Sequence, residues 1–131
     1  MTKIIYNSER YFTVFDYSPS HGRLLIRSDK RKGHDTNIDI IFFDTQFIQV
    51  FNMLDSIKIK LLDKSESEIK YKTVSNYLNY EDNNLFEIES NGESYFIAAF
   101  FVRVYKNELE HYESNLELGN KGKTILISSS I

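Results

Sequence analysis

The chain has 131 residues, the usual length of one domain, and apolar residues are spread along all of it. It contains no cysteine, which excludes disulfide bonds, thiolate catalysis and cysteine-ligated zinc. Its formal net charge of −3 argues against general binding to nucleic acid or to an anionic membrane, because both need a basic surface. We therefore expect a single domain over residues 1–131, with no nucleic-acid or membrane partner.

The first part of the chain predicts a series of short strands. Alternating apolar and polar residues, many of them β-branched or aromatic, predict strands at Tyr11–Tyr17, Arg23–Asp29 and Asn37–Phe43. A turn at Ser18–Gly22 joins the first two strands, because proline presets φ and glycine permits a positive φ. A polar loop, Asp29–Thr36, joins the second strand to the third.

The middle of the chain contains two ambiguous segments. Asp44–Leu54 fits helical spacing, but its short length and β-branched content favour an irregular strand. Ile57–Leu62 alternates cleanly, and its lysines indicate a solvated or edge strand. Asp63–Tyr80 contains a capping-box pattern at Ser65 and Glu68, which favours a helix. However, Glu68–Val74 alternates like a strand paired to Ile57–Leu62, and its β-branched and aromatic content makes the strand our preferred interpretation.

The clearest local signal is a hairpin within Leu85–Tyr105. Two apolar and aromatic runs flank Asn91-Gly92, the pair that best tolerates the positive φ angles of a two-residue type I′ turn. The second run, Tyr95–Tyr105, is apolar on both faces. We therefore expect it to form one central strand that is covered on both sides.

The last part of the chain predicts one helix and one strand. In Asn107–Leu118, a capping residue and an apolar stripe at helical spacing predict a helix that ends at Gly119. Lys123–Ile127 predicts a strand, and Ser128–Ser130 is expected to fray. The expected fold is mainly β, all-β or α+β. We expect an antiparallel, partly open barrel or sandwich of about seven or eight strands with one C-terminal helix.

A basic cluster surrounds the second predicted strand. Arg23 and Arg27 point to the same side of that strand, and with the loop lysines they are candidates for binding a phosphate or a carboxylate-rich partner. The alternative is a solvated hairpin that its charges keep soluble. If the turn centres near Gly33, Arg27 lies opposite Asp39. We therefore predict a cross-strand ion pair, worth at most about 1 kcal/mol if it is exposed.

Arg103 is the second candidate, because it lies between apolar neighbours in a predicted central strand. A charge in such a place is paired or lines a cavity. The functional interpretation is an anion anchor in a barrel interior or cleft. The structural alternative is an ion pair with Asp39, Glu87 or Glu89.

Tyr77 and Tyr80 open a loop that is rich in aromatic and acidic residues and has no core periodicity. Tyrosine is favoured at protein interfaces, and carboxylates attract a basic partner. The two tyrosines are therefore candidate anchors for a protein partner. The alternative is an ordinary polar connection.

The sequence lacks the motifs that mark catalytic and cofactor sites. It has no G-x-S-x-G elbow, no P-loop and no G-x-G-x-x-G. An enzyme would need His21 or His34 beside a carboxylate in a cleft, and these two histidines and His111 are far apart without metal-ligand spacing. We therefore expect no enzyme activity, no cofactor and no metal.

These observations favour a binding protein. The negative charge, the aromatic loop and the lack of catalytic motifs favour a small soluble module that binds a protein partner, of the inhibitor or toxin-immunity type. The alternative is a small-ligand-binding β-barrel with Arg103 as anion anchor. The absence of a signal-peptide pattern and a composition typical of AT-rich bacterial genomes favour a bacterial, cytoplasmic protein. A homodimer through an exposed strand edge is compatible with either function.

Overall fold

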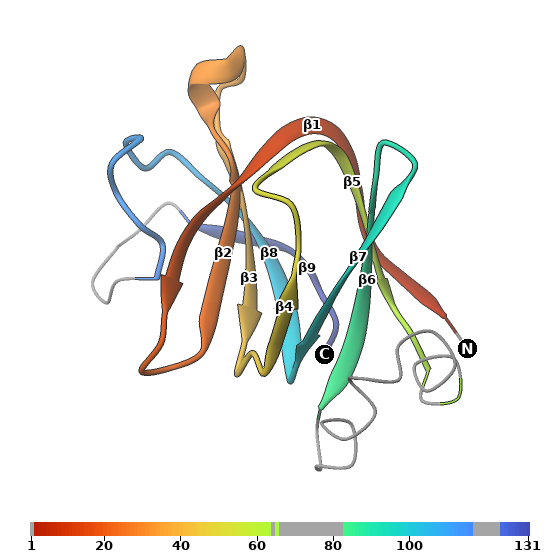
Figure 1. Cartoon of the computed structure of the whole chain (residues 1–131). Coiled ribbons are helices and arrows are strands. Elements are labelled where there is room, and N and C mark those ends of the chain that lie inside the picture. Colours follow the sequence, from red (N-terminus) through yellow and green to blue (C-terminus); the bar gives the residue numbers. More distant parts are fainter. Residues whose placement is uncertain (1, 64, 66–82, 117–123) are drawn as a thin grey trace.

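The computed structural model describes residues 2–63, 65, 83–116 and 124–131, and their nine strands form one open antiparallel sheet (Figure 1). The strands are β1 (Lys3–Ser18), β2 (Arg23–Ser28), β3 (Asn37–Phe43), β4 (Phe47–Gln49), β5 (Met53–Leu61), β6 (Asn84–Ser90), β7 (Glu93–Ala99), β8 (Phe101–Asn107) and β9 (Ile125–Ser129). Their order across the sheet is β4-β7-β6-β5-β1-β2-β3-β8-β9. The predicted antiparallel β class is confirmed, with more strands than the seven or eight expected.

β1 is the long strand that joins the two halves of the sheet. It pairs with β5 along most of its length and with β2 through its last residues, and Figure 1 shows it arching across the top. Register shifts between Ser8 and Tyr11 and between Val14 and Asp16 mark β-bulges, which bend a strand and increase its twist. The sequence predicted only Tyr11–Tyr17 of this strand, because bulges interrupt the two-residue alternation.

The sheet curves so that its two halves enclose one apolar core. Phe42 of β3 and Phe86 of β6 belong to strands far apart in the sheet order, yet their ring centroids lie 5.5 Å apart. Both rings are completely buried, as is Phe12 of β1. The inward face of nearly every strand contributes to this cluster. Burial of such large side chains stabilises each by roughly 1.5–3 kcal/mol, so the core supplies most of the driving force for folding.

The predicted Asn91-Gly92 hairpin is confirmed, with φ angles of 52° and 82° at its two turn residues. The single strand predicted at Tyr95–Tyr105 is wrong. The run divides at Phe100 into β7, which pairs with β6 and β4, and β8, which pairs with β3 and β9. Ala99 and Val102 both face the core, so Phe100 shifts the alternation by one residue. The shift explains why the run seemed apolar on both faces.

The interpretations of the middle segments are also corrected. β5 lies between β1 and β6, not at an edge, and its lysines face glutamates of β6, with an ion pair between Lys60 and Glu89. Asp44–Leu54 contains the short edge strand β4 and the start of β5, not one irregular strand. All of Asp63–Tyr80 except residues 63 and 65 lies outside the described residues.

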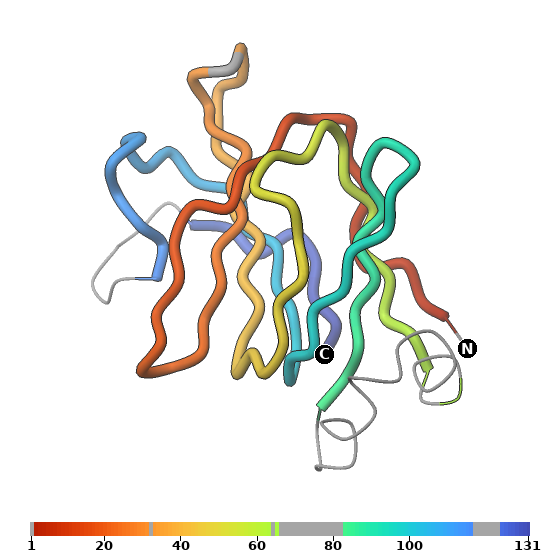
Figure 2. The backbone as a smooth tube through the Cα atoms, viewed as in Figure 1, coloured from red at the N-terminus to blue at the C-terminus, as the bar shows by residue number. Residues whose placement is uncertain are grey.

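The helix predicted at Asn107–Leu118 is wrong over its described part, where turns and irregular backbone follow the end of β8. The side chain of Asn107 is buried, accepts a hydrogen bond from Leu109 N and donates to Asp39 of β3. Sheet contacts of this kind outweigh helical spacing. The segment 108–116 therefore lies against the outer face of the sheet, beside the end of β1 (Figure 2).

The prediction that the serines at 128–130 fray is wrong. Ser128 is part of β9, and its hydroxyl donates to the carbonyl of Ile5 in β1. Ser130 exchanges two hydrogen bonds with Val102, one through its backbone N–H and one through its Oγ. Because these groups complete the sheet, the serines are part of the folded structure.

Candidate functional site

The candidate site lies on the face of β2, β3 and β8 that points away from the core. Leu24 and Ile26 of β2 belong to the core, so alternation places Arg23 and Arg27 on the opposite face. Ile41 of β3 pairs in register with Arg103 of β8, and the outer face therefore carries three arginines, two on β2 and one on β8, with β3 between them. The segment 108–116 covers part of this face.

Arg27 is committed to the structure. Its Nε and Nη2 atoms donate to the two carboxylate oxygens of Asp39 at 2.6 and 2.9 Å, and Nη1 donates to the Glu113 carbonyl at 2.8 Å. Its guanidinium carbon also lies 4.2 Å from the ring centroid of Phe15. The predicted pairing of Arg27 with Asp39 is confirmed, but the arginine side chain is 1% exposed, so the pair is buried and not a surface contact.

A hydrogen-bond network continues from this ion pair. Asn107 Nδ2 donates to Asp39 at 2.7 Å, and Asn37 Nδ2 donates both to Asn107 Oδ1 and to the Leu109 carbonyl. Ser114 Oγ donates to the carboxylate of Asp16 in β1. These bonds hold the segment 108–116 on the sheet near both of its ends, at Leu109 and at Ser114. Buried networks that satisfy their members in this way make a structure rigid.

Arg23 and Arg103 lie together at the edge of this fixed segment, in a pocket of about 260 Å³ that we call the arginine pocket. The described residues that line it are Arg23, Ile41, Phe43, Arg103, Tyr105, Asn115, Leu116 and Thr124. The guanidinium carbons of Arg23 and Arg103 lie 5.5 and 5.9 Å from the ring centroid of Phe43. Both cations therefore contact the same aromatic ring.

Neither cation of the arginine pocket is neutralised by a described residue. No carboxylate in the described ranges forms an ion pair with Arg23 or Arg103. The partners considered for Arg103 are engaged elsewhere: Asp39 with Arg27, Glu89 with Lys60, and Glu87 with Ser94. The predicted structural ion pair of Arg103 with one of them is therefore wrong.

Two buried donors in the pocket have no hydrogen-bond partner among the described residues. They are Nε of Arg103 and Nδ2 of Asn115. A buried donor without a partner costs about 1–3 kcal/mol, and more for a charged group. Among the described residues, two such donors and two cations therefore have no acceptor, and an anionic group on a ligand would supply one.

Asn115 was not a candidate in the sequence, since it lies within the segment interpreted as a helix. The contacts of its neighbours Ser114 and Glu113 with the sheet hold it at the pocket. Its role depends on this tertiary placement, and no local sequence pattern signals it. Tyr77 and Tyr80, the other predicted anchors, lie outside the described residues.

The remaining candidates do not converge on the arginine pocket. His21, His34 and His111 are all exposed on different segments. Among the residues that the structure describes, no group of three histidine or acidic side chains is placed to hold a metal ion. Within those residues, no helix has the length and apolar character needed to cross a membrane.

No protein-family model matches this sequence, and no curated protein or solved structure is significantly similar to it.

Proposed function

We propose that this protein is a non-catalytic binding protein that recognises an anionic group at the arginine pocket. The observation that carries the proposal is the pair of buried donors, Arg103 Nε and Asn115 Nδ2, which lack a partner among the described residues. The contact of Arg103 with the ring of Phe101 at 4.8 Å holds its guanidinium in place before a ligand arrives. Preorganised donors of this kind increase affinity because less ordering is needed on binding.

The size and lining of the pocket indicate the kind of ligand. Its volume of about 260 Å³ is below the roughly 300–1,000 Å³ of pockets that enclose drug-sized molecules. It therefore suits a small anion or the charged end of a larger molecule. Phe43, Ile41 and Leu116 add apolar surface, which favours a carboxylate on an apolar body over free inorganic phosphate.

No catalytic step is part of this proposal. The described residues that line the pocket include neither a histidine nor a carboxylate, the groups that most often accept a proton in catalysis. The described polar side chains there are arginine, asparagine, threonine and tyrosine, which hold a charge by hydrogen bonding. No cofactor or metal enters the proposal.

Titration with benzoate and with inorganic phosphate, at constant ionic strength, tests the proposal. We expect saturable shifts of the Arg103 and Asn115 side-chain signals in NMR spectra, with benzoate binding more tightly than phosphate. Arg103→Met should weaken benzoate binding at least tenfold. Lys106→Met, which removes an exposed cation from the same strand, should leave it unchanged. Equal binding by both variants, or no saturable binding of either anion, would overturn the proposal.

A protein-binding module of the inhibitor or toxin-immunity type, located in the bacterial cytoplasm, is a second proposal. The observation that favours it is on another surface, where Phe51 and Met53 are 57% and 50% exposed.

A homodimer through a sheet edge is a third and compatible proposal. β9 forms one edge of the sheet and carries the exposed residues Ile125, Leu126 and Ile127. Exposed apolar edge strands tend to pair with another chain. Leu126→Lys should therefore reduce concentration-dependent association in sedimentation equilibrium. A parent protein that stays monomeric at all concentrations would contradict the proposal.

A further inference from the structure

A second surface lies where β1 and β5 approach the turn of the β6–β7 hairpin. Phe51 and Met53 project there from the start of β5 and the residues before it. This segment is held in place, because the Asn52 carbonyl accepts a hydrogen bond of 2.9 Å from Val14 N in β1. The two exposed apolar side chains are therefore presented on fixed backbone and do not belong to a loose end.

These side chains border a hollow of about 310 Å³, which we call the aromatic-acidic hollow. Its main lining residues are Tyr11, Phe51, Met53, Asp55, Glu93 and Tyr95. Tyr11 pairs in register with Asp55, and Glu93 stands at the base of the hairpin turn, opposite Ser90. Three strands and the turn thus bring aromatic rings and carboxylates to one place.

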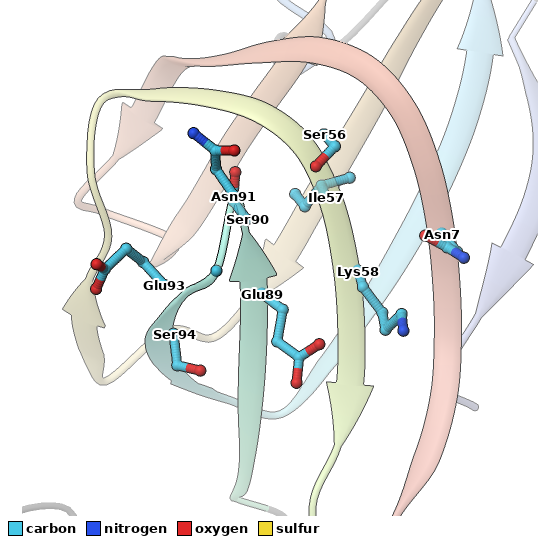
Figure 3. Close-up of a pocket in the computed structure, with 10 residues that line it drawn as sticks. Asn7, Ser56, Ile57, Lys58, Glu89, Ser90, Asn91, Glu93 and Ser94 are labelled. Atoms are coloured by element: carbon cyan, nitrogen blue, oxygen red, sulfur yellow. The ribbon is translucent and has the colours of Figure 1, made fainter.

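The charge of the hollow is negative. Asp55 and Glu93 are exposed, and neither forms an ion pair with any cation in the described part of the chain. Figure 3 shows the Glu93 side chain pointing away from Lys58. Exposed carboxylates beside aromatic faces attract a guanidinium or ammonium group, through charge and through the cation–π interaction.

A second hollow, of about 410 Å³, continues along the same hairpin (Figure 3). It shares Ser90, Asn91 and Glu93 with the first, and its other described lining is mostly polar. An apolar and aromatic centre with a polar margin is the usual composition of a protein–protein interface. The two hollows together therefore form a larger contact surface than one side chain needs.

We infer that the aromatic-acidic hollow is a docking site for a basic protein, which inserts an arginine or lysine side chain between the tyrosines and Phe51. The neighbouring polar hollow then contacts the residues that flank the inserted side chain. This inference specifies the surface and the partner chemistry of the protein-binding proposal. It does not depend on the arginine pocket, which lies on a different part of the sheet.

A pair of synthetic peptides tests the inference. One carries a single arginine between two aromatic residues, and the other carries citrulline, the neutral isostere, at the same position. We expect the arginine peptide to shift the backbone NMR signals of Tyr11, Phe51 and Tyr95, and the citrulline peptide to bind at least tenfold more weakly. Equal binding by the two peptides, or shifts confined to other surfaces, would overturn the inference.

Variants of the protein provide the matched controls. Asp55→Asn combined with Glu93→Gln should weaken binding of the arginine peptide at least tenfold, and Phe51→Ser should do so independently of charge. Tyr112→Ser removes an even more exposed aromatic residue outside the hollow and should have no effect. Thermal melting of each variant reports whether it is folded. The conservative carboxamide pair keeps the test valid if Phe51→Ser does not fold.

The same experiment separates this inference from the arginine pocket. Arg103→Met should retain full binding of the arginine peptide and lose benzoate binding. The carboxamide variant should show the reverse. A photo-crosslinker placed at residue 53 then reports the natural partner. Crosslinking to a second copy of this chain, or to a protein without a basic surface, would contradict the proposed partner chemistry.

Discussion

Arg27 of β2 and Arg103 of β8 lie on the same outer face of the sheet, on either side of β3, but their surroundings differ. Arg27 has a carboxylate, a carbonyl and an aromatic ring as partners, and it is buried. Arg103 has aromatic rings but no described carboxylate, and its Nε atom is buried without an acceptor among the described residues. A cation whose hydrogen bonds are complete holds a fold together, whereas a cation with an open donor is available for a ligand.

The difference arises from what covers each arginine. The network of Asn37, Asn107 and Asp39 encloses Arg27 beneath the segment 108–116. The same segment reaches the arginine pocket through Asn115 and Leu116, and Nδ2 of Asn115 has no hydrogen-bond partner among the described residues. Within the described part of the chain, this segment therefore completes the hydrogen bonds of Arg27 and not those of Arg103.

The largest expected loss of stability follows from removing the carboxylate partner of Arg27. Asp39→Ala leaves a buried guanidinium without its carboxylate, and should lower the free energy of unfolding by about 3–5 kcal/mol. Urea denaturation measures this loss. Asp35→Ala, at an exposed position in the adjacent loop, should change the free energy by less than about 0.5 kcal/mol. A loss below about 1 kcal/mol for Asp39→Ala would show that Arg27 is not committed to the fold.

Replacing both members of the ion pair should lower the free energy of unfolding less than removing Asp39 alone. Arg27→Met combined with Asp39→Leu removes both charges together, so no buried charge is left unpaired. We expect the double variant to be more stable than Asp39→Ala alone, because an apolar pair often replaces a buried ion pair at little cost. A double-mutant cycle with the single variants gives the coupling energy. Purely additive single effects would rule out a strong interaction between the two side chains.

Substitution of Arg103 is expected to change the free energy of unfolding very little. Arg103→Met keeps apolar packing on Phe101 and loses a cation–π contact worth roughly 0.5–1 kcal/mol. It also removes a buried donor that has no partner in the described part of the chain. The free energy of unfolding should therefore stay within about 1 kcal/mol of the parent value or rise. Parallel urea denaturation of Lys106→Met provides the reference. A loss of 3 kcal/mol or more would make Arg103 a structural residue like Arg27.

The smallest effect is expected at an exposed ion pair near Arg27. Burial opposes ionisation of Asp29, but hydrogen bonds from the side chain and backbone of Arg31 outweigh it and lower the pKa of Asp29 below its usual 3.8. A lowered folded pKa stabilises the protein above the unfolded pKa, and this contribution is lost as pH falls through the folded pKa. Asp29→Asn should remove a contribution of under about 1 kcal/mol that unfolding curves detect between about pH 5 and pH 2. Identical acid profiles for variant and parent would contradict this prediction.

Features set by short-range pairing were predictable from sequence. Asn37–Phe43 was predicted with its observed bounds, and the pairing of Arg27 with Asp39 followed from the short loop between β2 and β3. The hairpin at Asn91-Gly92 was equally local, because the turn residues themselves select the backbone conformation. In each case the residues that determine the contact lie within a few positions of it.

Features set by distant contacts were not predictable. The bulges of β1 and the phase shift at Phe100 depend on which strands lie alongside, and a single sequence does not specify this. The helical spacing after Asn107 was genuine, but buried side-chain hydrogen bonds to β3 outweighed it. Asn115 reaches the arginine pocket for the same reason. The candidate site was therefore predictable in its two arginines and not in the asparagine that completes it.

The hydrogen bond between Ser128 and Ile5 has a consequence for how the protein folds. It joins residues that are 123 positions apart, and β1 also needs β5 as a partner. β2 follows β1 directly and pairs with its last residues, but the rest of β1 pairs only when strands from much later in the sequence reach it. Sheets dominated by such distant pairs fold slowly, on the millisecond to second scale. Charged residues in a strand that stays exposed during folding oppose aggregation, and β1 carries Lys3, Glu9 and Arg10.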